Sequence, residues 1–153
     1  MDALIIFGAN YLYLVVVGVA AVYTLLQPRA ERKRILLLAS IALPLAYIIA
    51  KIGSLAYYDP RPFIVGNFTP LVPHVPDNGF PSDHTLLTAA LASVVYAHSK
   101  KVGVGLWIFT LGVGASRVAA GVHHSIDIVG SVLIASSVTY AIYFFLKRKF
   151  VSV

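Results

Sequence analysis

The chain has 153 residues, of which 59% belong to the apolar set AVILMFWYC and only 12% are charged, and its mean hydropathy is +0.84. Soluble globular proteins carry about 25% charged residues, so this composition argues against a water-soluble domain and against a disordered chain. The absence of cysteine excludes a disulfide framework and a thiolate zinc site. At roughly 20 residues for each membrane-spanning helix, the length allows about five or six spans with short loops.

Five apolar stretches follow one another along the chain. The first covers residues 3–26, and a charged turn at 29–34 separates it from the second, residues 35–58, which only Lys51 interrupts. A long polar segment, residues 59–82, contains six of the eight prolines and is predicted to be neither helix nor regular strand. The last three apolar stretches are residues 85–99, 102–116 and 128–146.

These stretches predict an all-α, polytopic membrane helix bundle with about five transmembrane helices, forming one membrane-embedded domain over residues 1–153. The apolar runs are continuous and do not alternate, which disfavours a closed β-barrel. The third and fourth stretches have only 15 residues each, so four spans with a re-entrant element, or six helices in all, are the alternatives. Residues 1–3 lack the basic region of a signal peptide and are interpreted as the start of the first span.

Nine of the twelve Lys and Arg residues fall on one side of a five-span arrangement. They lie in the charged turn at 29–34, at Lys100 and Lys101, and in the tail at 147–149. Because basic loops are retained in the cytoplasm, this side is predicted to be cytoplasmic. The N-terminus and the segments 59–82 and 117–127 are then predicted to lie on the outer side, and the C-terminus in the cytoplasm.

The other ionisable residues gather toward that outer side, where their position at membrane depth indicates a function. They include the three remaining cations, Lys51, Arg61 and Arg117. The guanidinium fork of Arg matches phosphate oxygens and Lys adds a point charge, so these cations are expected to bind a phosphate or diphosphate without a metal. The start of the third apolar stretch adds free backbone N–H groups next to the Ser82 hydroxyl.

Two histidines on the same side suit the two roles of phosphoryl transfer. One imidazole attacks phosphorus, and the other gives a proton to the leaving oxygen. His123 and Asp127 are spaced i, i+4, so one helical turn would place a carboxylate beside the ring and fix its tautomer. This spacing favours His123 as the nucleophile and His84 as the acid.

Three segments resemble the signatures of the type 2 phosphatidic acid phosphatase superfamily, over residues 51–127. Ser116-Arg117, five residues, His123, three residues and Asp127 match the third signature. The second signature is similar to Pro81-Ser82-Asp83-His84, and Arg61-Pro62 resembles the end of the first. Within the superfamily, Pro-Ser-Asp-His and residues 59–63 look like the bacitracin-resistance-type undecaprenyl-diphosphatases.

The resemblance implies an α-helical core and a phosphohistidine mechanism that uses no metal and no cofactor. It implies His123 as nucleophile, Asp127 as its partner and His84 as acid. It also implies that the phosphate is held by a set of cationic and helix-start residues, namely Lys51, Arg61, Ser82, the backbone of Asp83, and Arg117.

Two positions depart from the family pattern. The family's lysine would fall on Ser54, and Lys51 lies about one helical turn earlier, so its ammonium group can still reach the site. Asp83 replaces the more usual Gly, and we interpret its side chain as a cap for the third span.

The remaining polar residues of the outer side are interpreted as structural. His124 is expected to point away from the site, and His74 and His98 have no assigned role. Asp59 and Asp77 are interpreted as turn residues, with a divalent metal as the alternative.

The leading hypothesis is hydrolysis of undecaprenyl diphosphate to undecaprenyl phosphate and phosphate on the outer membrane face. The same chemistry on phosphatidylglycerol phosphate or phosphatidate is the first alternative. A small channel or transport subunit, with intramembrane charges along an ion path, is the alternative from another class. The expected partners are a lipid substrate and membrane lipids, without nucleic acid.

Overall fold

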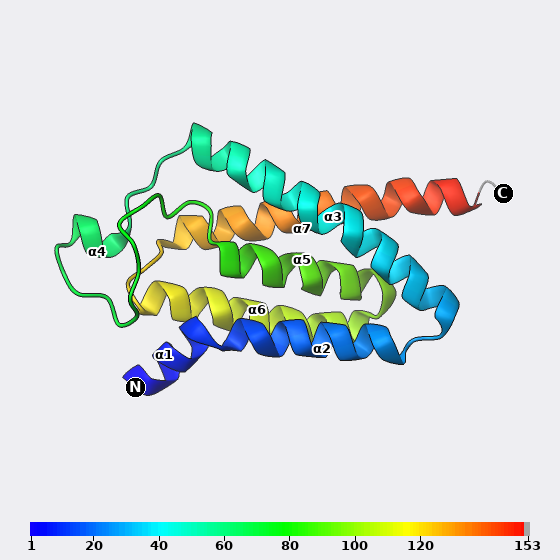
Figure 1. Ribbon diagram of the computed structural model, residues 1–153, viewed down its shortest axis with the longest axis horizontal. Helices are drawn as coiled ribbons and strands as arrows, with labels where there is room; N and C mark the ends of the chain where they lie inside the picture. Colours follow the sequence, from blue (N-terminus) through cyan, green and yellow to red (C-terminus); the bar gives the residue numbers. More distant parts are fainter. Residues whose placement is uncertain (152–153) are drawn as a thin grey trace.

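Helices make up nearly all of the regular structure in the computed structural model, which describes residues 1–151 and their side chains as far as residue 148 (Figure 1). Seven helices occur in this part of the chain, and the only β-type pairing among its residues is an isolated bridge between Pro60 and Asn78. In chain order they are α1 (Asp2–Asn10), α2 (Leu12–Leu26), α3 (Arg29–Ala56), α4 (Pro62–Val65), α5 (Asp83–His98), α6 (Lys100–Ala119) and α7 (Ser125–Val151).

Each predicted apolar stretch corresponds to helix, and the prediction of an all-α membrane bundle is confirmed. Helices α3, α6 and α7 are long and apolar enough to cross a membrane. The first stretch is broken at Tyr11, where α1 and α2 meet at a bend of 45°, and this pair counts as a fourth candidate span. Helix α5 has 16 residues and is shorter than the roughly 20 residues of a full span.

One part of the sequence-based prediction is wrong. The proline-rich segment 59–82 was expected to contain no helix, but α4 forms a single turn there. Pro62 occupies the first position of α4, where its missing N–H would have no intrahelical partner in any case. The ring therefore stabilises the start of this turn instead of preventing it.

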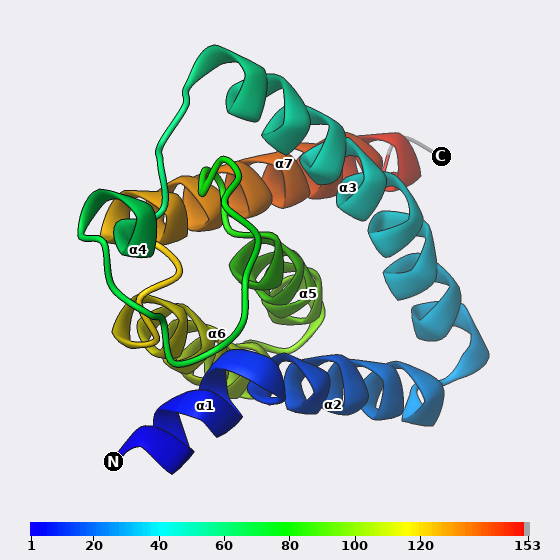
Figure 2. The same cartoon turned by 60° about the vertical axis from the view of Figure 1, so that its left-hand side comes forward.

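Helix α5 lies in the middle of the bundle, with the other long helices around it and α2 on one side (Figure 2). It packs against α2, α3, α6 and α7. Nine of its residues are buried, and most of them are small, including Ala89, Ala92 and Ser93. A helix that is apolar on all sides is typical of the centre of a bundle.

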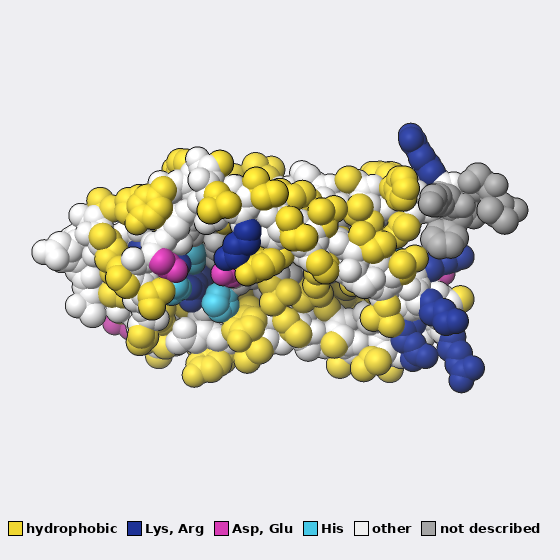
Figure 3. Space-filling view, turned by 45° about the horizontal axis from the view of Figure 1, so that its top comes forward, with side chains coloured by type: hydrophobic (Ala, Val, Ile, Leu, Met, Phe, Trp, Pro, Cys, Tyr) yellow, Lys and Arg dark blue, Asp and Glu magenta, His cyan; other side chains and the backbone are white. Residues whose placement is uncertain are grey.

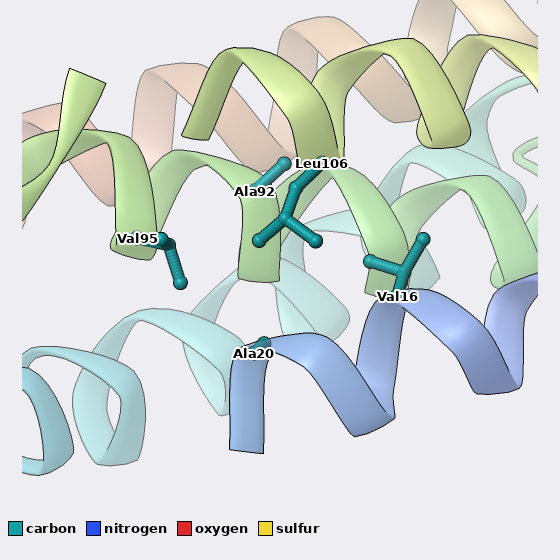
Figure 4. Close-up of a cluster of buried hydrophobic side chains, with 5 residues drawn as sticks. All are labelled: Val16, Ala20, Ala92, Val95 and Leu106. Carbon is teal, nitrogen blue, oxygen red and sulfur yellow. The ribbon is translucent and has the colours of Figure 1, made fainter. Parts of the chain in front are cut away.

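The packing between α2, α5 and α6 illustrates how small residues bring these helices together (Figure 4). Its buried cluster contains one large side chain, Leu106, among the smaller Val16, Ala20, Ala92 and Val95. Small residues allow close backbone approach, which is the common mode of helix packing in membranes.

The two ends of the bundle differ in character. The end of α3, the start of α5, the end of α6 and the start of α7 meet at one end, together with α4 and its loops (Figure 1). At the opposite end, α3 begins with the charged turn at 29–34, α6 begins at Lys100 and α7 ends (Figure 1), and basic side chains project there in Figure 3. Lys149, which belongs to the predicted basic tail, has a side chain outside the described residues.

Candidate active site

The connection between α6 and α7 positions His123. The backbone N–H of Gly121 donates to the carbonyl of Val118 (2.9 Å), and that of Val122 donates to the carbonyl of Arg117 (3.3 Å). This pair of bonds is the Schellman motif, which needs a left-handed residue after the helix, and Gly121 has φ +78°. The chain therefore reverses sharply after α6 and directs His123 toward the bundle, where it is only 3% exposed.

Asp127 contacts both the His123 side chain and the His124 backbone in this connection. Its Oδ2 atom accepts from the backbone N–H of His124 (2.9 Å) and contacts Nδ1 of His123 at 3.1 Å. The first of these bonds resembles a capping box, in which an acidic or amide side chain at the third helical position satisfies the N–H before the helix. The expected helical turn between His123 and Asp127 is not formed, because α7 begins at Ser125, yet the pair is still in contact.

Arg61 determines which nitrogen of His123 carries the proton. Its Nη1 lies 3.3 Å from Nε2 of His123 and donates to the carbonyl of Val122 at 2.8 Å. A guanidinium group has no acceptor, so Nε2 must accept in this contact. The proton of the neutral ring is therefore on Nδ1, where it faces Asp127, and the lone pair of Nε2 faces Arg61.

Arg61 itself is 5% exposed and is held from several directions. It directly precedes α4, and its Nε donates to Oδ1 of Asp77 at 2.7 Å while Nη2 donates to the carbonyl of Asn78 at 3.4 Å. The sequence-based interpretation of Asp77 as a simple turn residue missed this ion pair, because it forms across a loop of 16 positions.

The predicted residues meet at a cavity of about 260 Å³. Figure 3 shows His, acidic and basic side chains gathered on the same face near this end of the bundle. Six predicted site residues line the cavity, namely Lys51, Arg61, Asp83, His84, Arg117 and His123. It is also lined by His74, Asp77, Asn78 and Ser54, which sequence reasoning did not place in the site.

Helix α5 supplies the second histidine at its start. His84 is the second residue of α5, and its ring packs edge-on against Tyr13 of α2 with centroids 4.7 Å apart. Lys51 lies one helical turn before Ser54 on α3, and both residues line the cavity despite the shifted spacing. The Nζ atom of Lys51 is 5.1 Å from the ring centroid of Tyr47.

Ser82 and Asp83 differ from their expected arrangement. Ser82 is fully buried, does not line the cavity, and its Oγ accepts from the hydroxyl of Thr85 at 3.2 Å. Asp83 is the first residue of α5, and Ser82 is the residue before the helix, so the interpretation of Asp83 as the cap is wrong. Among the described residues no side-chain hydrogen bond caps α5, and Asp83 lines the cavity.

Arg117 reaches the cavity from the last turn of α6. It is 3% exposed, and its Nη1 donates to the carbonyl of Ala9 in α1 at 3.4 Å. Its Nε has no hydrogen-bond partner within the described part of the chain. A buried guanidinium with an unsatisfied N–H is suited to binding an anion that enters the cavity.

The surroundings of His123 favour the neutral form of its imidazole ring. Burial lowers the pKa of His123 below its ordinary value, and the charges of Arg61 and Arg117 act in the same direction against the opposing effect of Asp127. Burial, together with the charge of Arg61, also lowers the pKa of His74, whose ring centroid is 6.1 Å from that of His123. The site therefore combines a neutral nucleophile candidate with two buried arginines.

A second, more open hollow of about 490 Å³ also touches His123 and His124. Its lining includes the apolar residues Phe68, Leu71 and Val118 but no Lys or Arg. An anionic phosphate group is consequently better accommodated in the smaller, cation-lined cavity.

One group of three residues has side chains of the kind that bind metal ions. Asp59, His124 and Asp127 each place one side-chain oxygen or nitrogen within 4.8 Å of the others. His124 is not part of the lining of the cation-lined cavity, and its Nδ1 lies 3.0 Å from Oδ2 of Asp59. The close contact of these two atoms is that of a hydrogen-bonded pair.

The chain combines a bundle of apolar helices with a cavity lined by histidines and cations. The sequence profile of the PAP2 superfamily matches residues 33–150. The chain belongs to this superfamily, which confirms the resemblance of its three signatures, and it is a lipid phosphatase of the membrane.

Known relatives agree with this assignment. The chain is 31% identical over 153 residues to the undecaprenyl-diphosphatase BcrC of Bacillus subtilis, covering 99% of this chain and 79% of the relative. It is 33% identical over 138 residues to the bacitracin transport permease protein BcrC of Bacillus licheniformis, covering 88% and 66%. The crystal structure of LpxE from Aquifex aeolicus has the same fold, with a TM-score of 0.71 at 21% identity over 92% of this chain and 81% of that one.

Proposed function

We propose that the protein removes the terminal phosphate of undecaprenyl diphosphate, leaving undecaprenyl phosphate, through a phosphohistidine formed on His123. The observation that carries this proposal is the position of Nε2 of His123, 3.3 Å from Nη1 of Arg61 and beside a cavity lined by Lys51, Arg61 and Arg117. The choice of lipid is supported by the similarity to a Bacillus subtilis protein named for this activity.

In the first step, Nε2 of His123 attacks the terminal phosphorus and the bond from that phosphorus to the bridging oxygen breaks. His84 gives a proton to the bridging oxygen, so that the lipid monophosphate leaves with one proton gained. The ring of His123 acquires positive charge, which the Asp127 carboxylate at 3.1 Å stabilises. The three cations stabilise the charge on the phosphoryl oxygens.

In the second step, water attacks the phosphorus of the phosphohistidine. His84, now neutral, takes a proton from this water, and the bond between phosphorus and Nε2 breaks. Inorganic phosphate leaves, and the electron pair returns to Nε2 of His123. The sum of both steps consumes one water for each phosphate released.

A groove beside the charged cavity supports a substrate with a long apolar chain. This groove has a volume of about 320 Å³ and lies between α3 and α5, with Leu43, Ala46, Leu86 and Ala90 in its lining. Asp83 lines both the groove and the charged cavity. A lipid can therefore place its phosphate among the cations while its chain lies between the helices.

The distribution of basic residues supports an active site on the outer face of the cell membrane, with the N-terminus outside and the C-terminus in the cytoplasm. The charged turn at 29–34 and the pair Lys100 and Lys101 lie at the end opposite the site. Basic loops are typical of the cytoplasmic side. An outward site suits a carrier lipid that must be dephosphorylated before it returns to the cytoplasm.

Phosphate release from three lipids tests the substrate. Purified protein in detergent with EDTA would be given undecaprenyl diphosphate, phosphatidylglycerol phosphate or phosphatidate, with His123→Ala as the inactive control. We expect the highest kcat/KM with undecaprenyl diphosphate. Faster turnover of either glycerolipid would agree with the proposed mechanism but contradict undecaprenyl diphosphate as the preferred substrate. No phosphate release from any of the three lipids would favour a transport role.

Single-cysteine labelling tests the orientation, because the chain has no cysteine of its own. Thr69→Cys in the loop after α4 should react with an impermeant thiol reagent added to intact cells, whereas Lys101→Cys should react only after the cells are opened. The reverse pattern would place the site in the cytoplasm and overturn the outer-face proposal.

A further inference from the structure

A second carboxylate and a second imidazole lie behind the His123–Asp127 pair. Oδ2 of Asp59 is 3.0 Å from Nδ1 of His124, although the two residues are 65 positions apart. Asp59 is also close to Asp127, since one side-chain oxygen or nitrogen atom each of Asp59, His124 and Asp127 lie within 4.8 Å of one another. The proposed mechanism assigns no role to Asp59 or to His124.

The Asp127 carboxylate needs one more hydrogen-bond donor. Its Oδ2 is in contact with Nδ1 of His123 and accepts from the backbone N–H of His124. Its Oδ1 is buried and has no partner in the part of the chain that the structure describes. A buried acceptor without a donor is unfavourable, so a neighbouring proton would stabilise this arrangement.

The loop that carries Asp59 is held directly against Asp127. The backbone N–H of Asp59 donates to Oδ1 of Asn78 (2.9 Å), and the backbone N–H of Gly79 donates to the carbonyl of Asp59 (2.8 Å). A Cβ atom on Gly79 would lie 2.9 Å from Oδ2 of Asp127, closer than side chains normally approach. Glycine therefore allows the loop to pack on the carboxylate and to keep Asp59 beside it.

We propose that Asp59 is a positioning residue for the hydrolysis, which donates a carboxyl proton to Oδ1 of Asp127 while it accepts a hydrogen bond from Nδ1–H of His124. The inference rests on the proposed function and deepens it. The proton stays on Asp59, so Asp127 remains ionised and continues to balance the charge that develops on His123. Asp59 acts through Asp127 and does not contact the substrate.

The electrostatics of Asp59 agree with this role. Burial raises the pKa of Asp59, and the Asp127 charge acts in the same direction, whereas His124 opposes them. The titratable groups that face Asp59 are Asp127, which lies in α7, and His124, the residue directly before α7. Two carboxyl groups in contact retain a proton more readily than either would alone.

Two substitutions of Asp59 test the role in the reaction. Asp59→Ala should lower kcat by about 10–100-fold with KM unchanged, the range typical of residues that orient a reacting group. Asp59→Asn should retain most of the wild-type kcat, because its amide N–H₂ can donate to Asp127 and its amide oxygen can accept from His124. Asp2→Ala, at the exposed start of α1, is the matched control.

The partnership with His124 is tested by a double-mutant cycle. If His124 acts through Asp59, the double variant Asp59→Ala/His124→Ala should have a kcat no lower than that of the slower single variant. His98→Ala, which removes a histidine at the opposite end of α5, is the control and should keep the wild-type rate.

Several outcomes would overturn the inference. They are a wild-type kcat in Asp59→Ala, an Asn variant as slow as the Ala variant, a change confined to KM, or fully additive effects in the cycle. Loss of wild-type activity in EDTA with recovery in Mn²⁺ would assign these three residues to a metal instead.

An infrared titration separates this inference from the proposed function, because it needs no turnover. A protonated carboxyl band that persists above the ordinary Asp pKa and disappears in Asp59→Asn would support the shared proton even if no tested lipid were hydrolysed. If that band is the same in both proteins, the inference fails whatever the substrate is.

Discussion

Nη1 of Arg61 lies 3.3 Å from Nε2 of His123, although the two residues are 62 positions apart. Because an arginine only donates, this contact keeps Nε2 unprotonated, with its lone pair directed at Arg61. The same guanidinium lines the cavity that would hold the phosphate. Arg61 therefore links the tautomer of the proposed nucleophile to the cavity proposed to bind the phosphate.

Arg61→Lys should lower kcat/KM by about 10–100-fold, which corresponds to losing one charged hydrogen bond of roughly 1.5–3 kcal/mol. A single ammonium group cannot face Asp77, the carbonyl of Val122 and Nε2 of His123 together, as the guanidinium does. Initial rates with undecaprenyl diphosphate would measure the loss. The matched control is Arg34→Lys at the far end of the bundle, where an exposed pair with Glu31 is unrelated to the site.

His123→Ala should reduce turnover by at least about 10³-fold, because the covalent route is then closed. In the wild-type protein, rapid denaturation during turnover of substrate labelled in the terminal phosphate should trap an acid-labile label on the chain. The label should be absent from His123→Ala and present in His98→Ala. A labelled His123→Ala protein, or one that still turns over, would show that another residue is the nucleophile.

The apolar stretches and the signature residues could be predicted because both are local properties of the sequence. A run such as residues 35–58 is apolar over the length of a span, and it corresponds to most of α3. The break at Tyr11 could not be predicted, because no proline or charge interrupts residues 3–26. Neither could the turn of α4, which uses a proline to begin a helix.

The contacts that complete the site join segments that are distant in the sequence. Asp59 pairs with His124 because the loop before α5 packs on the residues before α7, and Arg61 pairs with Asp77 within that loop. Motif spacing says nothing about such loop contacts, so Asp59, Asp77 and His124 were interpreted as structural. Conversely, Ser82 matched the motif, yet its hydroxyl lies outside the cavity lining.

Asp127→Asn should lower kcat by about 10³–10⁴-fold while KM changes little, as expected when the partner of a catalytic imidazole loses its charge. Asn can donate toward Nδ1 of His123, which would move the ring proton to Nε2 and block the attack. Steady-state kinetics on the folded variant would separate kcat from KM. A loss confined to KM would mean that Asp127 contributes to binding and not to the nucleophile.

Removal of divalent metals should leave the rate of the wild-type protein unchanged, because Lys51, Arg61 and Arg117 supply the positive charge that faces the phosphate. Phosphate release would be followed before and after dialysis against EDTA, and again with Mg²⁺ or Mn²⁺ added back. If the rate falls with EDTA and recovers with one ion, these three cations do not balance the charge of the phosphate by themselves.

The acid limb of the rate, where His123 becomes protonated, should lie below pH 6.5, the ordinary pKa of histidine. Burial lowers the pKa of His123, and attack needs its unprotonated form, so the active fraction persists until the pH drops below this lowered value. Because Asp127 acts to raise the pKa of His123, Asp127→Asn should move the acid limb to a still lower pH even though its maximal rate is smaller. Profiles of kcat/KM against pH would measure the acid limb of the wild-type protein and that of Asp127→Asn. An acid limb centred above 6.5 in the wild type, or a limb at higher pH in Asp127→Asn, would assign the titration to a group other than His123.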